Sequence, residues 1–168
     1  MKIGNWKIEN YGARSGITII EIVIALAILV MVAVLGLVAL NPAGQLGNAR
    51  NNQRIANVNT ILLSIRTNLS DSRTGVFNSG NGSGVCAAGD LPTSSKKMAV
   101  GAGNYDIAGC LAPTYLAVLP FDPSAPGAHY ASVSDYDTGY YLIKNASSGL
   151  VTISAPSAEF GKVISATQ

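Results

Sequence analysis

Apolar residues form one nearly uninterrupted run close to the start of the chain. The run covers residues 17–40 and contains a single charged residue, Glu21. A helix needs about 20 apolar residues to cross a bilayer, so the run predicts a membrane-spanning helix. A carboxylate inside such a helix costs roughly 2.5 kcal/mol or more unless it has a partner. Glu21 is therefore a candidate functional residue.

The pattern after residue 40 is first broken and then helical again. Asn41-Pro42-Ala43-Gly44, followed by Gly47, predicts a kink or a local break near 41–47, because proline cannot donate a backbone hydrogen bond and glycine adds freedom. The sequence allows either one kinked helix or two helices joined by a loop. A stripe at helical spacing then predicts a helix that packs on a globular domain. Its members are Ile55, Val58, Leu62, Ile65 and Leu69.

The rest of the chain predicts a long surface loop and a small antiparallel sheet. Residues 71–95 are rich in glycine, serine and asparagine, which is typical of loops. Short apolar or alternating segments predict strands at 97–100, 115–119, 129–133, 140–144 and 150–154, with a turn at 120–123 and a hairpin loop at 145–149. Residues 155–168 have too little pattern for an assignment. The predicted fold class is therefore α+β.

Charge indicates how the chain is oriented. Charged residues make up 12% of the chain, and the net charge is +2. Lys2, Lys7 and Arg14 precede the apolar run, and the residues from 17 onward include eight basic and eight acidic side chains. Such a balance gives no global nucleic-acid footprint. Because basic flanks stay in the cytoplasm, we expect the N-terminus inside and the bulk of the chain outside.

The two cysteines then lie in a compartment that permits disulfides. Pairing Cys86 with Cys110 would close a loop of about 25 residues and contribute roughly 3 kcal/mol. Two separate buried thiols are the alternative. With two cysteines and one histidine, the sequence does not favour a zinc site.

The boundary between the polar leader and the apolar run carries the most specific motif. A basic leader ends at Gly16, the apolar run starts at Ile17, and Glu21 is the fifth residue after the glycine. This arrangement resembles the type IV pilin and type II secretion pseudopilin family, although Ile17 stands where the family usually has phenylalanine. The resemblance implies cleavage after Gly16 by a prepilin peptidase, N-methylation of Ile17 and an assembly role for Glu21.

Other interpretations of this boundary predict a different role for the apolar segment. A secretory signal peptide has a shorter apolar core, and its small residue follows that core. A plain membrane anchor with an incidental Glu21 is a second alternative. A buried core helix would carry an apolar stripe, whereas this run is apolar on every face.

The resemblance also implies a domain order and a structural, non-enzymatic role. A leader (1–16) precedes a long helix (17–70), whose first half (17–40) spans the membrane and drives assembly, and a β-rich, pilin-like head (71–168) follows. The precursor would leave the cytoplasmic membrane for a homo-oligomeric helical filament, at the cell surface or in the periplasm. Its partners would be the peptidase, an inner-membrane assembly platform and membrane lipid before assembly, with DNA or a surface ligand as further candidates. No cofactor is implied.

Two other functions stay open at this point. The chain could be a pseudopilin of a type II secretion system. The pattern Leu-Pro-x-Asp-Pro at 119–123, before antiparallel strands, resembles the globular domains of major pseudopilins and of short pilins, so it fits either function. It could also be a membrane-anchored binding protein that never polymerises.

Several weaker motifs have two interpretations each. Arg50 and Arg54, one turn apart, predict a solvated or subunit-facing edge, with DNA contact as the alternative. Asp135 and Asp137 are candidate calcium ligands, with a solvated turn as the alternative. For His129 we expect a structural or solvent-facing role rather than catalysis.

Three asparagines begin N-glycosylation triplets, at positions 68, 81 and 145. The triplet is short, and this chain is rich in asparagine and serine, so chance matches are expected.

Overall fold

The computed structural model describes residues 16–39, 41–72, 77 and 86–168. Most of the predicted leader, much of the predicted loop at 71–95 and Asn81 lie outside the described residues. The chain divides into two compact units, residues 1–42 and 43–168, and each is treated by itself below.

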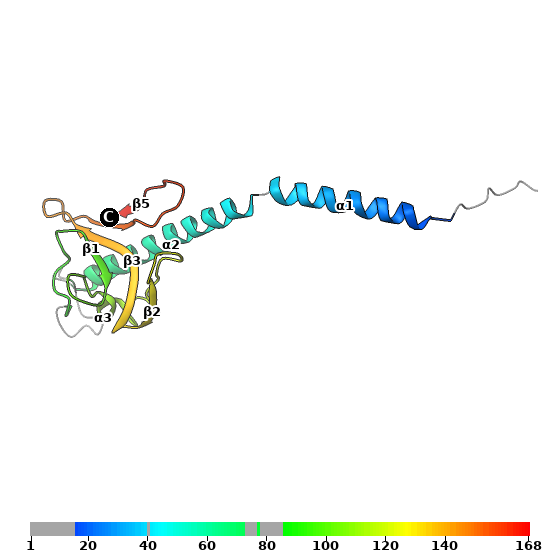
Figure 1. The fold of residues 1–168 in the computed structure, drawn as a ribbon. Coiled ribbons are helices and arrows are strands. Elements are labelled where there is room, and N and C mark those ends of the chain that lie inside the picture. Colours follow the sequence, from blue (N-terminus) through cyan, green and yellow to red (C-terminus); the bar gives the residue numbers. More distant parts are fainter. Residues whose placement is uncertain (1–15, 40, 73–76, 78–85) are drawn as a thin grey trace, which may run out of the picture. The chain divides into compact units, whose positions relative to one another are not determined.

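The apolar run forms a single helix, α1 (Ile19–Ala39), coloured blue in Figure 1. The predicted break falls directly after it. Asn41 has a positive φ of 42°, which ends helical geometry, and Pro42 begins the next helix, α2 (Pro42–Asp71). Proline suits this first helical position because its missing N–H would have no helical partner there. The backbone thus departs from helical geometry at Asn41, and Gly44 and Gly47 lie within α2.

α2 packs on the head through a face that differs from the predicted stripe. Val58, Leu62 and Ile65 are buried as predicted, and Ile61 joins them. Ile55 is exposed, which corrects the start of the stripe. Arg54, expected on a solvated or subunit-facing edge, is completely buried, so that prediction is wrong. The contacts that bury it are described with the site.

The sheet is antiparallel and is built around its longest strand. Its spatial order is β1-β3-β4-β5, and β2 also pairs with β3. β1 and β2 both pair with Asp137 of β3, so they lie on opposite edges of it. β2 and β4 lie on the same edge of β3, β2 beside residues 135–137 and β4 beside residues 141–144. Within the described part of the chain, residues 138–140 have no neighbouring strand on that edge, and we call this gap in the sheet the notch. The strands are β1 (Lys96–Ala99), β2 (His129–Ser132), β3 (Asp135–Lys144), β4 (Val151–Ala155) and β5 (Ile164–Thr167).

The strand predicted at 115–119 is absent, and the strand β5 was not predicted. A short helix, α3 (Ala108–Leu111), precedes residues 115–119, and the N–H groups of Tyr115 and Leu116 donate to the Leu111 carbonyl. These local bonds use the backbone groups that a sheet would need, so the segment turns. Leu119 is nevertheless buried as a single core residue.

The core of the head lies between α2 and the sheet. α2 contributes Ile61 and Ile65, and the sheet contributes Tyr140, Leu142 and Ile153, all almost fully buried. Burial of a large apolar side chain contributes about 1.5–3 kcal/mol. The α+β layout predicted from the sequence is therefore present in the structure.

Candidate functional site

The predicted cleavage point lies just outside α1. Gly16, Ile17 and Thr18 are exposed and non-helical, and α1 starts at Ile19. The Thr18 hydroxyl accepts a hydrogen bond from the Glu21 N–H at 3.3 Å, and the Thr18 carbonyl accepts bonds from the N–H groups of Glu21 and Ile22. This is the geometry of an N-cap, which satisfies N–H groups that the first helical turn leaves open. The helix therefore begins two residues after the Gly16–Ile17 bond and leaves that bond accessible.

Glu21 is the only charge on α1. Ile17 and Glu21 line the same shallow hollow at the start of the helix, with Ile22 and Ala25 beside them. The structure thus places Ile17, which the predicted cleavage would make the N-terminus, beside Glu21. A carboxylate in the first helical turn is also favoured by the helix dipole.

The rest of α1 presents apolar side chains in every direction. Every residue of 16–37 is exposed within the described chain, and α1 is long and apolar enough to cross a membrane. A helix that is apolar all round needs lipid or protein neighbours. α1 therefore supports a membrane anchor or a helix-packing segment.

The two cysteines form the predicted disulfide. Cys86 and Cys110 are bonded to each other, with their Cα atoms 5.6 Å apart, and both are buried. The Asn68 side chain donates to the Cys110 carbonyl at 3.0 Å, and the Cys86 N–H donates to the Phe77 carbonyl at 2.9 Å. The bond therefore ties the segment that follows α2 to the end of α3. The alternative of two free thiols is excluded.

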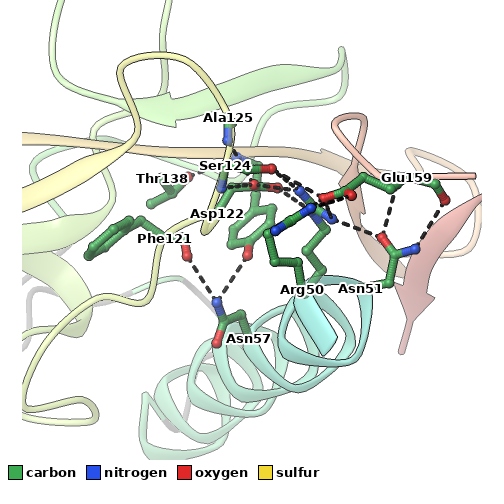
Figure 2. Close-up of polar contacts among 11 residues, drawn as sticks. Arg50, Asn51, Asn57, Phe121, Asp122, Ser124, Ala125, Thr138 and Glu159 are labelled. Carbon is green, nitrogen blue, oxygen red and sulfur yellow. Dashed lines mark hydrogen bonds and ion pairs between the residues drawn. The ribbon is translucent and has the colours of Figure 1, made fainter. Parts of the chain in front are cut away.

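A second polar arrangement, which we call the head clamp, holds two loops on α2 (Figure 2). It consists of Arg50, Asn51 and Arg54 on α2, Asp122 and Ser124 on the loop before β2, and Glu159 on the loop between β4 and β5.

Asp122 lies at the notch in the sheet and is held there by backbone hydrogen bonds. Its N–H donates to the Thr138 carbonyl at 2.8 Å, so the loop fills the gap between β2 and β4. Its Oδ1 accepts hydrogen bonds from the N–H groups of Ser124 and Ala125, both at 2.9 Å. Gly139 lies beneath the loop with a φ of +72°, and a Cβ there would come within 3.0 Å of Asp122 Cβ. Contacts within the loop and with the sheet therefore fix the position of the carboxylate independently of α2.

Arg54, on α2, binds this carboxylate. Its Nε donates to Asp122 Oδ2 at 2.8 Å and its Nη2 to Oδ1 at 3.0 Å, with both side chains fully buried. The remaining guanidinium N–H groups donate to Ser124, Asn51 and Glu159. A buried ion pair persists when such additional bonds satisfy it. Arg54 has no surface left for a phosphate.

Glu159 anchors the second loop through both its side chain and its backbone. Arg50 donates to the two carboxylate oxygens at 2.6 and 2.7 Å. The Asn51 side chain donates to the Glu159 carbonyl and accepts from its N–H. Hydrogen bonds from Arg50, and secondarily from Arg54, lower the pKa of Glu159 to about 2. Its neighbour Phe160, at a φ of +59°, covers Gly47 of α2.

The weaker candidates have partners within the head. Lys97 binds Asp137, and His129 Nε2 lies 3.1 Å from Asp135 Oδ1. Among the described residues, no group of three or more metal-ligating side chains occurs. Asp137 thus forms an ion pair with Lys97 across the sheet, and Asp135 contacts the His129 ring within its hairpin.

The two glycosylation triplets that the structure describes differ in the solvent exposure of their asparagines. Asn68 is fully buried against Cys110, whereas Asn145 is exposed in the turn before β4, where its side chain caps the N–H groups of Ser147 and Ser148. Only the Asn145 triplet is exposed among those that the structure describes.

Sequence reasoning missed the head clamp, apart from its Asp122 motif. The available signal was a second helical series on α2, in which Asn51, Arg54 and Asn68 share a face with Val58 and Ile65. Polar residues in such a series suggest solvent unless their partners are known, and the partners here follow at least 42 residues later.

Searches against protein-family models, curated proteins and solved structures gave no match to this chain.

Proposed function

We propose that the chain is the precursor of a pilin-like filament subunit, which is cut between Gly16 and Ile17 and then polymerises through α1. The observation that carries the proposal is the junction itself. An exposed, non-helical Gly16–Ile17 bond directly precedes a capped helix that is apolar on every side and has one carboxylate in its first turn. The head contributes a disulfide and a charge-neutral clamp, which suit a subunit exposed outside the cytoplasm.

Each part of the junction has a role in this proposal. A protease needs an extended peptide bond, and the Thr18 cap keeps the helix away from it. Before cleavage α1 holds the subunit in the membrane. In a filament it would exchange lipid for protein neighbours, which leaves its apolar surface out of water in both states. Glu21 would exchange a costly position in lipid for a charge partner.

The proposal is tested in cells that contain an active prepilin peptidase and an assembly platform. Intact-mass analysis of the membrane-extracted chain should show loss of residues 1–16, and shearing should release high-mass filaments. Gly16→Leu should block the cut, because a bulky side chain should not fit beside the bond. An uncut wild-type chain in these cells, or a cut chain that stays monomeric, would overturn the proposal; the second outcome would favour a membrane-anchored binding protein.

A pseudopilin of a type II secretion system is the second candidate. Asp122 supports it as much as the first, since the Leu-Pro-x-Asp-Pro pattern resembles the heads of major pseudopilins and of short pilins, and this residue has a structural role here. Deletion of the chain discriminates the two. Loss of surface filaments supports a pilus subunit, whereas loss of secretion in cells without visible filaments supports a pseudopilin.

A further inference from the structure

The turn between β3 and β4 carries a modification motif that the proposed function does not use. Asn145-Ala146-Ser147 is an N-glycosylation triplet, which requires serine or threonine at its third position and any residue except proline at its second. Residues 145–150 are all exposed. The triplet at Asn68 differs, because that asparagine is fully buried and its amide is bonded inside the head. The fold thus leaves one of these two triplets accessible and protects the other.

Backbone hydrogen bonds hold Asn145 at the start of this turn. Its N–H donates to the Leu150 carbonyl, and its carbonyl accepts from the Gly149 N–H, both at 2.8 Å. Gly149 has a φ of +73°, a left-handed geometry that glycine adopts without strain. The acceptor asparagine therefore has a defined position at the end of the hairpin.

The side chain of Asn145 uses its oxygen and leaves its nitrogen available. Oδ1 accepts hydrogen bonds from the N–H groups of Ser147 at 2.9 Å and Ser148 at 3.0 Å, whereas Nδ2 has no hydrogen-bond partner within the described part of the chain. A glycan is attached to the nitrogen, so both bonds to the oxygen can persist in the product.

The two serines of the turn differ in the same respect. The Ser148 hydroxyl accepts a hydrogen bond from the Leu150 N–H at 3.4 Å. The Ser147 hydroxyl has no partner among the residues that the structure describes. The hydroxyl that the triplet requires is therefore the one that remains available to an enzyme.

The turn also lies far along α2 from the membrane anchor. Gly149 lines a hollow with Leu69, near the end of α2. Leu69 is separated from Pro42, the first residue of this helix, by about 40 Å along the helix axis. A bulky group on the turn would thus leave the first turns of α2 uncovered. The disulfide and the basic flank of the apolar run favour a head outside the cytoplasm, where exported chains receive N-glycans.

We propose that Asn145 is an N-glycosylation site, modified by an oligosaccharyltransferase on the outer side of the membrane. The donor is an oligosaccharide linked through a diphosphate to a membrane lipid. A bond forms between Asn145 Nδ2 and the anomeric carbon of the sugar, and the bond from that carbon to the diphosphate oxygen breaks. The lipid diphosphate leaves with the electron pair, and one amide proton passes to a base of the transferase. The inference depends on export of the head and not on cleavage or polymerisation, so filament yield does not decide it.

Intact-mass analysis tests the site on the full chain, isolated from the membranes of the cells that produce it naturally. We expect the wild-type chain to carry a glycan, which peptide mapping should locate on Asn145. Ser147→Ala should abolish the glycan, because it removes the required hydroxyl but keeps the backbone N–H that binds Asn145 Oδ1. Ser148→Ala, in the same turn, is the matched control and should keep the glycan, as should Ser147→Thr.

The disulfide provides the folding control for these variants. Non-reducing peptide mapping should show Cys86 bonded to Cys110 in each of them, so that loss of the glycan reflects the triplet rather than a misfolded head. Three results would overturn the inference: an unmodified Asn145 in the wild-type chain, a glycan that remains after Asn145→Gln, and equal loss of the glycan from Ser147→Ala and Ser148→Ala.

Discussion

At the scale of single residues, Arg54 is among the largest fully buried side chains of the head. It joins α2 to Asp122 and Ser124 with no exposed side-chain surface. Arg54→Ala would leave the Asp122 carboxylate buried without its partner, so we expect the free energy of unfolding to fall by about 3–5 kcal/mol. Arg66→Ala, on an exposed part of the same helix, should change it by less than about 0.5 kcal/mol.

Urea titration of the detergent-solubilised chain, followed by near-ultraviolet circular dichroism of the tyrosines, measures both variants. Equal midpoints for the Arg54 and Arg66 variants would show that the buried pair does not stabilise the head.

Glu159 gives the head a defined dependence on pH. Its pKa is lowered in the folded chain to about 2, so the unfolded chain binds the proton more tightly. The stabilisation is therefore complete above the ordinary glutamate pKa of about 4.3 and is lost as the pH falls towards 2. Glu159→Gln should flatten the stability profile between about pH 4.5 and 2 while leaving its shape above pH 6 unchanged. Parallel profiles for the two proteins across the acid range would contradict the assignment.

At the scale of elements, the notch in the sheet depends on Gly139. Gly139→Ala would place a methyl group against Asp122 and Ala125 at a φ of +72°, whereas Gly149→Ala, at +73°, would meet open space. The strain of a left-handed residue is roughly 1–2 kcal/mol and should be common to both variants. We expect Gly139→Ala to lower the midpoint of thermal unfolding clearly further, because the loop that carries Asp122 must also move. If Gly149→Ala lowers the midpoint as much, the loop does not rest on this glycine.

The same elements show which parts of the fold could be predicted from the sequence. α1 and most of the strands follow from local pattern, because an apolar run or an alternation of apolar and polar residues needs no distant partner. The packing face of α2 could not be predicted in this way. An arginine such as Arg54 is expected at the surface, and only its distant partner Asp122 explains why it is buried. β5 was missed because a four-residue strand carries almost no pattern, and its pairing with β4 is what defines it.

At the scale of the whole molecule, the candidate site and the head differ in how much a sequence can reveal. The junction at Gly16, Ile17 and Glu21 lies within six consecutive residues, so its motif could be recognised directly. The head clamp joins residues from three distant segments, and no local spacing connects Arg50 to Glu159. The proposed assembly would add a further scale, because the partner of α1 would be another copy, which the sequence of one chain does not contain as a separate signal.

Glu21 provides the prediction that separates a filament subunit from a simple anchor. Ile17 and Glu21 line one hollow at the start of α1, so the proposed cleavage would place an ammonium at Ile17 beside the Glu21 carboxylate. In a filament, an arriving helix can place its ammonium against the Glu21 of an older neighbour. Opposite charges about 4 Å apart attract by roughly 4 kcal/mol at an effective dielectric constant near 20, before desolvation is subtracted. Apolar packing alone tolerates sliding by a helical turn, whereas this contact fixes one register.

We therefore expect Glu21→Ala to leave membrane insertion and cleavage nearly intact but to abolish or sharply reduce polymerisation, because each neighbouring ammonium loses its partner. The cleaved membrane pool and the yield of sheared filaments are measured together in cells without other pilin-like subunits. Val34→Ala, a truncation on the same helix that changes no charge, is the matched control and should still give filaments. If Glu21→Ala also gives a normal yield, the carboxylate is incidental, and assembly would depend on apolar packing of α1 alone.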